Sequence, residues 1–255
     1  MERVRAKKHL GQHFLKDENI AFKIVEALDA SGLGSVLEVG PGTGVLTKYL
    51  LERMGDEFKA YDVDQESVSY LKKHYSDHED KFLYADFLKS DLSVLKGPIG
   101  VIGNFPYNIS SQLFFKIWDH RDEVKEVVCM IQKEVADRIV AKEGNKTYGI
   151  LSVLLQAFYE IEYLFSVPPH VFSPPPKVQS AVIRLVRRPN ERIGCDEKLF
   201  KAVIKAAFGK RRKTLRNALK DLALQIEDTS EEVFDKRAEQ LSVQQFIDLT
   251  NKLSA

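Results

Sequence analysis

The chain has 255 residues, of which 44% are hydrophobic and 29% charged, enough for a packed core and a soluble surface. Cys129 and Cys195 are its only cysteines and lack paired spacing, which excludes a disulfide framework and a zinc knuckle. No secretory signal follows the basic start, and Glu160 and Glu162 interrupt the longest apolar region, so we expect a cytoplasmic protein without a membrane span.

The net charge of +1 conceals an uneven distribution of basic residues. Arg3, Arg5, Lys7 and Lys8 stand against Glu2 alone at the start of the chain. A second basic cluster without any acid consists of Lys198, Lys201, Lys205, Lys210, Arg211, Arg212, Lys213, Arg216 and Lys220. Clusters of this kind indicate a phosphate-rich partner, although a solvated helix face is the simpler alternative.

In chain order, an amphipathic helix comes first, with Ile20 and Ile24 on its apolar face and Asp17 as its cap. Segments typical of strands and helices then alternate, which predicts a mainly parallel, doubly wound α/β sheet. The expected strands are residues 35–39, 58–63, 82–85, 99–103, 126–131 and 178–186. The expected helices are residues 45–53, 66–74, 111–118, 133–142 and 150–158.

The last part of the chain has a different pattern. Five prolines within residues 167–176 interrupt regular structure, and polar residues 187–196 are typical of a linker. The remaining pattern is helical, and Ser242-Val243-Gln244-Gln245 is a capping box for the final helix. We therefore expect two domains, residues 1–187 and a small all-helical domain of residues 188–255.

A glycine-rich turn, Glu38-Val39-Gly40-Pro41-Gly42-Thr43-Gly44, follows the strand at 35–39. It fails the dinucleotide pattern because Val45 stands at the sixth position, where that pattern needs glycine. It resembles instead the first motif of class I methyltransferases, which bind S-adenosyl-L-methionine. Asp62, at the end of the second strand, is placed to accept both ribose hydroxyls. Asp86 closes the third strand, where it can accept a hydrogen bond from the adenine amine.

The fourth strand is followed by Asn104-Phe105-Pro106-Tyr107. This sequence resembles the motif of amino-methyltransferases, in the form typical of enzymes that dimethylate adenine N6. The lone pair of an adenine amine is delocalised into the ring, and acceptors on both N–H groups can localise it. The side-chain oxygen of Asn104 and the carbonyl of Phe105 are the expected acceptors, Pro106 holds the backbone, and Tyr107 can stack on the unstacked base. Positioning and electrostatics then carry the reaction without a metal.

With these motifs the chain resembles the KsgA family, the small-subunit ribosomal RNA adenine dimethyltransferases, over essentially its whole length. Residues 8–15, 132–135, 171–178 and 207–217 add to the resemblance. It implies a Rossmann-like methyltransferase sheet and cofactor contacts at His13, Leu15, Gly40, Gly42, Asp62, Asp86 and Asn104. The family often has Asn where His13 stands and commonly has Glu in place of Asp62, so the shorter acid can hold the ribose less closely.

The resemblance also implies a substrate, namely two neighbouring adenosines in the 3′-terminal hairpin of 16S ribosomal RNA, each methylated twice during small-subunit biogenesis. Phe172 is then expected to face the target base opposite Tyr107. A monomer is expected. The residues expected to bind RNA phosphates are Lys7, Lys8, Lys210, Arg211, Arg212, Lys213 and Arg216.

Three other functions are compatible with parts of the sequence. An antibiotic-resistance dimethyltransferase of large-subunit RNA shares the cofactor and Asn-x-Pro-Tyr motifs, but the stretches at 11–15 and 208–216 argue against it. A DNA adenine methyltransferase more usually carries Asp-Pro-Pro-Tyr. The mitochondrial transcription factor B group shares the fold and acts as a binding protein, and a non-catalytic checkpoint in subunit assembly is a further hypothesis.

Overall fold

The structure is a computed structural model and describes residues 4–189, 192–222 and 230–254. Arg3, a part of the expected basic arm, lies outside the described residues. The chain divides into two compact units, residues 1–136 with 161–187, and residues 137–160 with 188–255. The second unit therefore combines the carboxy-terminal part of the chain with a segment from its middle.

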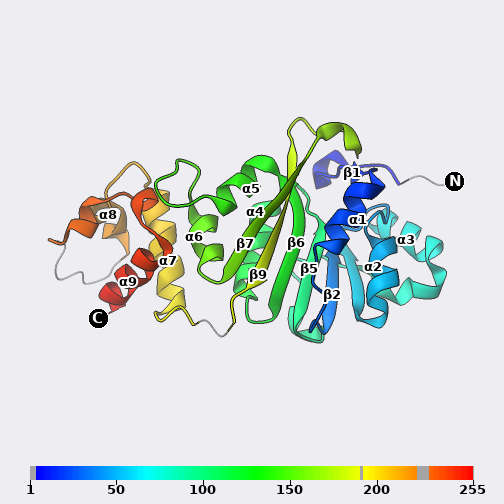
Figure 1. The fold of residues 1–255 in the computed structure, drawn as a ribbon, viewed down its shortest axis with the longest axis horizontal. Helices are drawn as coiled ribbons and strands as arrows, with labels where there is room; N and C mark the ends of the chain where they lie inside the picture. The colour runs from blue at the N-terminus through cyan, green and yellow to red at the C-terminus, as the bar shows by residue number, and fades with distance from the viewer. Residues whose placement is uncertain (1–3, 190–191, 223–229, 255) are drawn as a thin grey trace. The chain divides into compact units, whose positions relative to one another are not determined.

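A seven-stranded sheet forms the centre of the first unit (Figure 1). Its order is β4-β3-β2-β5-β6-β9-β7. The strands are β2 (Ser35–Val39), β3 (Phe58–Asp62), β4 (Phe82–Tyr84), β5 (Ile99–Asn104), β6 (Val124–Gln132), β7 (Tyr159–Val167) and β9 (Ser180–Arg187). From β4 to β6 all neighbours are parallel, and β9 joins β6 in an antiparallel register. The predicted doubly wound, Rossmann-like sheet is confirmed.

The helices of the first unit follow the strands as expected from the alternating pattern. They are α1 (Glu18–Glu26), α2 (Thr47–Met54), α3 (Gln65–His74) and α4 (Ser110–Asp119). Asp17 caps α1, as predicted, by accepting a hydrogen bond from the backbone N–H of Ile20 at 3.0 Å. Asp64 caps α3 in the same way, through the N–H of Glu66 at 3.0 Å. Both caps satisfy backbone donors that the first turn of a helix leaves free.

Two features of the strands were not predicted. Strand β7 begins at Tyr159, immediately after a segment expected to be helical to residue 158. Its alternation of Glu160 and Glu162 with less polar neighbours has the period of two that strands require. In addition, β1 (Phe14–Leu15) pairs antiparallel with β8 (Phe172–Ser173), which joins the amino-terminal arm to the proline-rich segment. Two residues per strand are too few to give a periodic pattern.

The second unit is helical, with α6 (Ile150–Gln156), α7 (Glu197–Gly209), α8 (Leu215–Ala218) and α9 (Val243–Ser254), while α5 (Lys133–Val140) crosses the division. In this unit the ring centroid of Phe208 lies 6.0 Å from that of Tyr148 and 5.9 Å from that of Phe246. The capping box of α9 is confirmed, since the Gln245 N–H donates to Ser242 Oγ at 3.2 Å and the Ser242 N–H to Gln245 Oε1 at 3.0 Å.

Parallel strands place their carboxyl ends at one edge of a sheet. In the first unit, Gly40 follows the end of β2, Asp62 ends β3 and Asn104 ends β5. Because β2 lies between β3 and β5, these three residues are brought to neighbouring positions at that edge. The sheet topology thus gathers residues that are far apart in the sequence.

Candidate active site

The turn after β2 requires glycine for two reasons. Gly40 and Gly42 have φ values of 71° and 54°, in the left-handed region that side chains disfavour. A Cβ atom on Gly42 would also lie 2.8 Å from two ring carbons of Phe14, closer than real Cβ contacts. The amino-terminal arm therefore packs directly on the glycine turn, and a residue with a side chain at position 42 would displace it.

Asp62 lies beside this turn with 6% of its surface exposed. Its carboxylate accepts hydrogen bonds from the backbone N–H groups of Asp64 at 2.8 Å and Gly42 at 3.3 Å, one on each oxygen. Burial raises the pKa of Asp62 to about 6, against these two hydrogen bonds, which lower it. Each oxygen keeps a further lone pair, so the ionised group can accept two more hydrogen bonds from a ligand.

Glu38, the first residue of the glycine motif, is the second buried acid of the site. It is 1% exposed and accepts a hydrogen bond from Thr47 Oγ1 at 2.7 Å. Burial raises its pKa to about 8, so near neutral pH it is mainly protonated. A protonated carboxyl keeps the interior behind the turn uncharged.

Asn104 is held by the amino-terminal arm. Its Nδ2 donates to the carbonyl oxygen of His13 at 2.8 Å, and only the NH2 end of the amide can make this bond. The orientation of the side chain is therefore determined, and Oδ1 is left as an acceptor in the pocket that Asn104 lines. Phe105, which follows, is anchored by its backbone N–H to the carbonyl of Met130 at 3.0 Å.

Tyr107 is held on two sides. Its hydroxyl forms a hydrogen bond with Oγ of Ser180, a residue of β9 that is fully buried. Its ring lies 5.2 Å from the ring of His13, at an interplanar angle of 33°. His13 Nδ1 in turn lies 2.8 Å from the carbonyl oxygen of Pro174. Ser180 was not singled out in the sequence because a lone serine in a strand carries no motif.

Several of these groups line one pocket. Its lining consists of Leu10, Gly11, Gln12, His13, Phe14, Gly40, Gly42, Asp62, Val63, Asn104, Phe105, Pro106 and Tyr107. Eight of these are predicted cofactor or catalytic residues, namely His13, Gly40, Gly42, Asp62, Asn104, Phe105, Pro106 and Tyr107. The pocket joins the glycine turn, an acid and the Asn-x-Pro-Tyr segment, so that a few polar groups converge on one concave site, as in small-molecule sites.

Three predicted site residues do not line this pocket. Leu15 and Phe172 pair across β1 and β8 and are 3% and 1% exposed, within the hydrophobic core. Asp86 Oδ1 accepts a hydrogen bond from the Leu88 N–H at 3.0 Å, and its Oδ2 lies 3.5 Å from Lys89 Nζ. The roles predicted for these three residues stay predictions.

The residues expected to bind RNA fall into two groups. Lys7 pairs with Asp64 and Glu66, Lys210 with Asp221, Arg211 with Glu239 and Arg216 with Asp235. In contrast, Lys8, Arg212 and Lys213 make no ion pair within the described ranges. Basic side chains without an acidic partner in the described residues remain available to phosphates. The sequence alone could not tell these residues from the paired ones.

Within the part of the chain that the structure describes, no group of three or more His, Cys, Asp and Glu residues is arranged to hold a metal. None of the helices described is both long and apolar enough to cross a membrane.

Comparison with known proteins gives the family. The family model described as "Ribosomal RNA adenine dimethylase" matches residues 3–255. The chain belongs to the ribosomal RNA adenine dimethylase family. Among curated relatives, the ribosomal RNA small subunit methyltransferase A of Cytophaga hutchinsonii is 58% identical over 100% of this chain and 99% of its own. The protein of the same name from Flavobacterium johnsoniae is 53% identical, over 100% and 98%.

Solved structures share the fold of this chain. A dimethyladenosine transferase from Plasmodium falciparum has a TM-score of 0.76 and 26% identity, with 94% of this chain and 96% of that one covered. The 23S rRNA methyltransferase ErmE has a TM-score of 0.69 and 22% identity, covering 95% and 100%, a likeness that shows the shared fold alone. Family membership thus rests on the sequence comparisons, whereas the fold is supported by the sequence comparisons and by the solved structures.

Proposed function

We propose that this chain transfers methyl groups from S-adenosyl-L-methionine to the N6 amines of two adjacent adenosines in the 3′-terminal hairpin of small-subunit 16S ribosomal RNA. The products are N6,N6-dimethyladenosines. One observation carries the proposal: the oriented amide of Asn104 and the acid Asp62 line the same pocket. An acceptor for an amine therefore lies next to a group suited to a ribose. The names of the curated relatives support the choice of the small subunit.

The residues of the pocket fit S-adenosyl-L-methionine. Gly40 and Gly42 both line the pocket, and because neither has a side chain a ligand can approach the backbone of the turn. Asp62, when ionised, has two lone pairs left for the ribose hydroxyls. Val63, which is 41% exposed beside Asp62, offers an apolar surface to the adenine. When bound, the cofactor supplies a methyl group activated by a sulfonium.

The chain's own residues prepare the adenine amine. Asn104 Oδ1 and the Phe105 carbonyl accept hydrogen bonds from its two N–H groups, which localises the nitrogen lone pair and aims it into the pocket. Tyr107 stacks on the base, in a position held by its contacts with Ser180 and His13. The backbone carbonyl of His13 also accepts the hydrogen bond from the Asn104 amide. The amino-terminal arm and the Asn-x-Pro-Tyr segment are therefore held together.

We propose that residues 1–187 carry the catalytic site and that residues 188–255 bind ribosomal RNA. Basic residues on the second unit support this division, as does the position of every pocket-lining residue in the first. The protein is proposed to act as a monomer in the cytoplasm, during biogenesis of the small subunit. A checkpoint role in subunit assembly belongs to the same proposal.

The RNA contacts can be tested by two pairs of substitutions in the second unit. Arg212→Gln with Lys213→Gln removes two charges that have no ion pair in the described structure, and Lys210→Gln with Arg216→Gln removes two paired ones. The first pair should lower the slope of log affinity against log salt by about one unit for each phosphate that the protein no longer neutralises. The second should change that slope less. Filter binding to a small-subunit RNA fragment over a salt series measures both, and equal slopes would contradict this prediction.

The function is tested by methyl transfer from labelled S-adenosyl-L-methionine to unmethylated small subunits, with large subunits and adenine-containing DNA as parallel substrates. We expect two methyl groups on each of two adenosines of the small subunit and none elsewhere. Label only on large subunits would assign the chain to the resistance enzymes. Cofactor binding without any transfer would refute the enzymatic function and favour an assembly or transcription role.

A further inference from the structure

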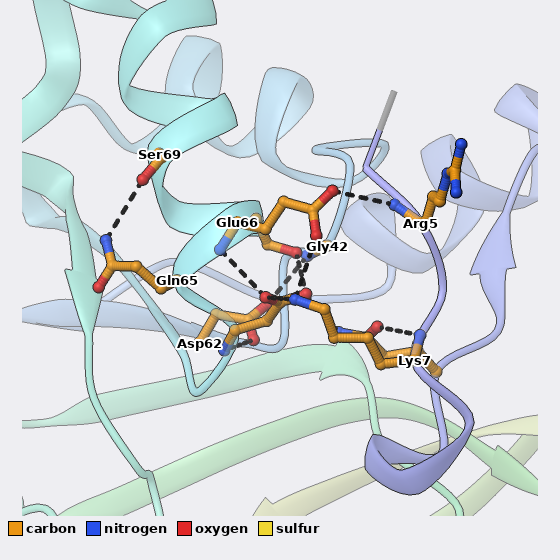
Figure 2. Close-up of polar contacts among 10 residues, drawn as sticks. Arg5, Lys7, Gly42, Asp62, Gln65, Glu66 and Ser69 are labelled. Atoms are coloured by element: carbon orange, nitrogen blue, oxygen red, sulfur yellow. Dashed lines mark hydrogen bonds and ion pairs between the residues drawn. The ribbon is translucent and has the colours of Figure 1, made fainter. Parts of the chain in front are cut away.

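Two neighbouring lysines of the amino-terminal arm have different surroundings. The ammonium of Lys7 pairs with the carboxylate of Asp64 and lies 3.2 Å from Glu66 Oε2, as Figure 2 shows for the side chains of Lys7 and Glu66. Lys8 is exposed and makes no ion pair in the described residues. The two positions therefore differ in their contacts, although both belong to the same basic run.

The pairing of Lys7 is reinforced by other contacts of the arm. Gln12 Nε2 donates to Asp64 Oδ2 at 3.2 Å, while Gln12 Oε1 accepts from the Lys7 N–H at 2.8 Å. The N–H of Arg5 lies 3.4 Å from Glu66 Oε1 (Figure 2). Lys7 and Gln12 are thus tied to each other and to the same carboxylate, which closes residues 7–12 into a loop fastened at the start of α3.

The anchor on α3 is rigid. Asp64 is 2% exposed, caps α3 through the Glu66 N–H at 3.0 Å and accepts from Ser67 Oγ at 3.2 Å. A carboxylate so deeply buried depends on a cation for compensation, because removing the partner leaves an uncompensated charge. Lys7 is the cation in contact with it.

The fastened loop leads directly into the pocket wall. Residues 10–14 line the pocket together with Gly40, Gly42 and Asp62, and Phe14 packs on Gly42. If the loop is released from Asp64, the beginning of this wall loses its attachment to α3 and keeps the bond from Asn108 Nδ2 to the His9 carbonyl at 3.2 Å. The other end of the wall stays attached through the hydrogen bond from Asn104 Nδ2 to the His13 carbonyl.

We propose that Lys7 is a positioning residue whose ion pair with Asp64 and Glu66 latches residues 10–14 over the cofactor pocket, so that cofactor retention depends on it. The proposal rests on the proposed function, since it takes this pocket as the S-adenosyl-L-methionine site. Lys7 then serves the cofactor, and Lys8 remains available to RNA phosphates.

Lys7 also acts on Asp62 through charge. The groups that face Asp62 are Lys7 from the arm, Asp64 from the turn after β3 and Glu38 from β2. Burial is the main reason that the pKa of Asp62 is raised to about 6; the charge of the Asp64 carboxylate adds to this rise, and the charge of Lys7 opposes it. Removing the Lys7 charge should therefore move the pH midpoint of cofactor binding upward, an effect that loss of packing alone would not produce.

The test compares Lys7→Met, Lys7→Arg and Lys8→Met in the full chain. Calorimetry with S-adenosylhomocysteine should show about tenfold weaker binding for Lys7→Met, as expected when a charge-assisted contact no longer keeps the binding conformation populated. Lys7→Arg should restore the affinity. Steady-state methylation of small subunits should show the loss in KM for the cofactor and not in kcat. Lys8→Met should keep the cofactor affinity and weaken RNA binding.

Two controls separate the possible failures. Glu66→Gln removes one of the two carboxylates without touching the Asp64 cap, so it gives a milder version of the same effect if Lys7→Met does not fold. A Lys7→Met protein that is folded, binds cofactor like the unmodified chain and loses only RNA affinity would overturn the latch. Failure of the proposed function would give a different result. Cofactor binding would still weaken in Lys7→Met, but no methyl group would be transferred to small subunits.

Discussion

Replacing Asn104 with alanine is expected to lower kcat for methyl transfer about 100- to 1,000-fold, the range for loss of one preorganised polar group at a reacting centre. The amide oxygen is oriented by the bond from Nδ2 to the His13 carbonyl and is proposed to accept a hydrogen bond from the target amine. Alanine removes that acceptor and leaves the glycine turn and Asp62 in place. The rate with saturating cofactor and small subunits measures the effect, and calorimetry should still detect cofactor binding.

Asn108 provides a matched control in the same segment. Its Nδ2 also donates to a carbonyl of the arm, that of His9 at 3.2 Å, but it does not line the pocket. Asn108→Ala should therefore lower kcat only a few-fold at most. Equal losses in the two variants would mean that Asn104 acts by fastening the arm and not as an acceptor, which would remove the main support for an amine substrate.

Replacing Asp62 with alanine is expected to weaken cofactor binding about 10- to 100-fold, the amount associated with charge-assisted hydrogen bonds. The ionised carboxylate is proposed to accept both ribose hydroxyls while it keeps the N–H groups of Gly42 and Asp64 satisfied. Calorimetric titration with S-adenosylhomocysteine measures the loss. Asp91→Ala is the control, because Asp91 is exposed, does not line the pocket and accepts a hydrogen bond from the Ser93 N–H at 2.9 Å. An unchanged affinity in Asp62→Ala would exclude this ribose contact.

Asp62 also predicts how cofactor affinity depends on pH. Its pKa in the folded chain is raised to about 6, so the ionised form that binds the ribose is dominant above pH 6 and lost below it. Affinity should fall by up to about tenfold per pH unit as the pH drops below 6 and should be nearly flat above it. Because the pKa of Asp62 is raised in the folded chain, ionising this group destabilises the cofactor-free protein. Its contribution to the free energy of unfolding is therefore lost as the pH rises through 6. Asp62→Ala should abolish the step in affinity, and persistence of the step would assign it to another group.

Much of the site could be predicted because its chemistry is carried by short segments at strand ends. The glycine turn, Asp62 and the segment beginning at Asn104 each follow a recognisable strand, and parallel strands bring their carboxyl ends together. The residues that were missed act through contacts distant in the sequence. Ser180 holds Tyr107 across 73 positions, and Asp64 holds Lys7 across 57. Neither serine nor aspartate carries a local signature for such a partner.

By itself, the sequence determined the doubly wound sheet, the family and the residue types at the edge of the sheet, since periodicity and motif spacing are local properties of the chain. Only the tertiary structure decided which of the described basic residues have an acidic partner, and that β1 pairs with β8. It also decided that Lys7 turns inward to α3 while Lys8 faces solvent. The physical reason is that ion pairs and packing depend on distances between segments remote in sequence, whereas a strand end and its turn are specified by adjacent residues.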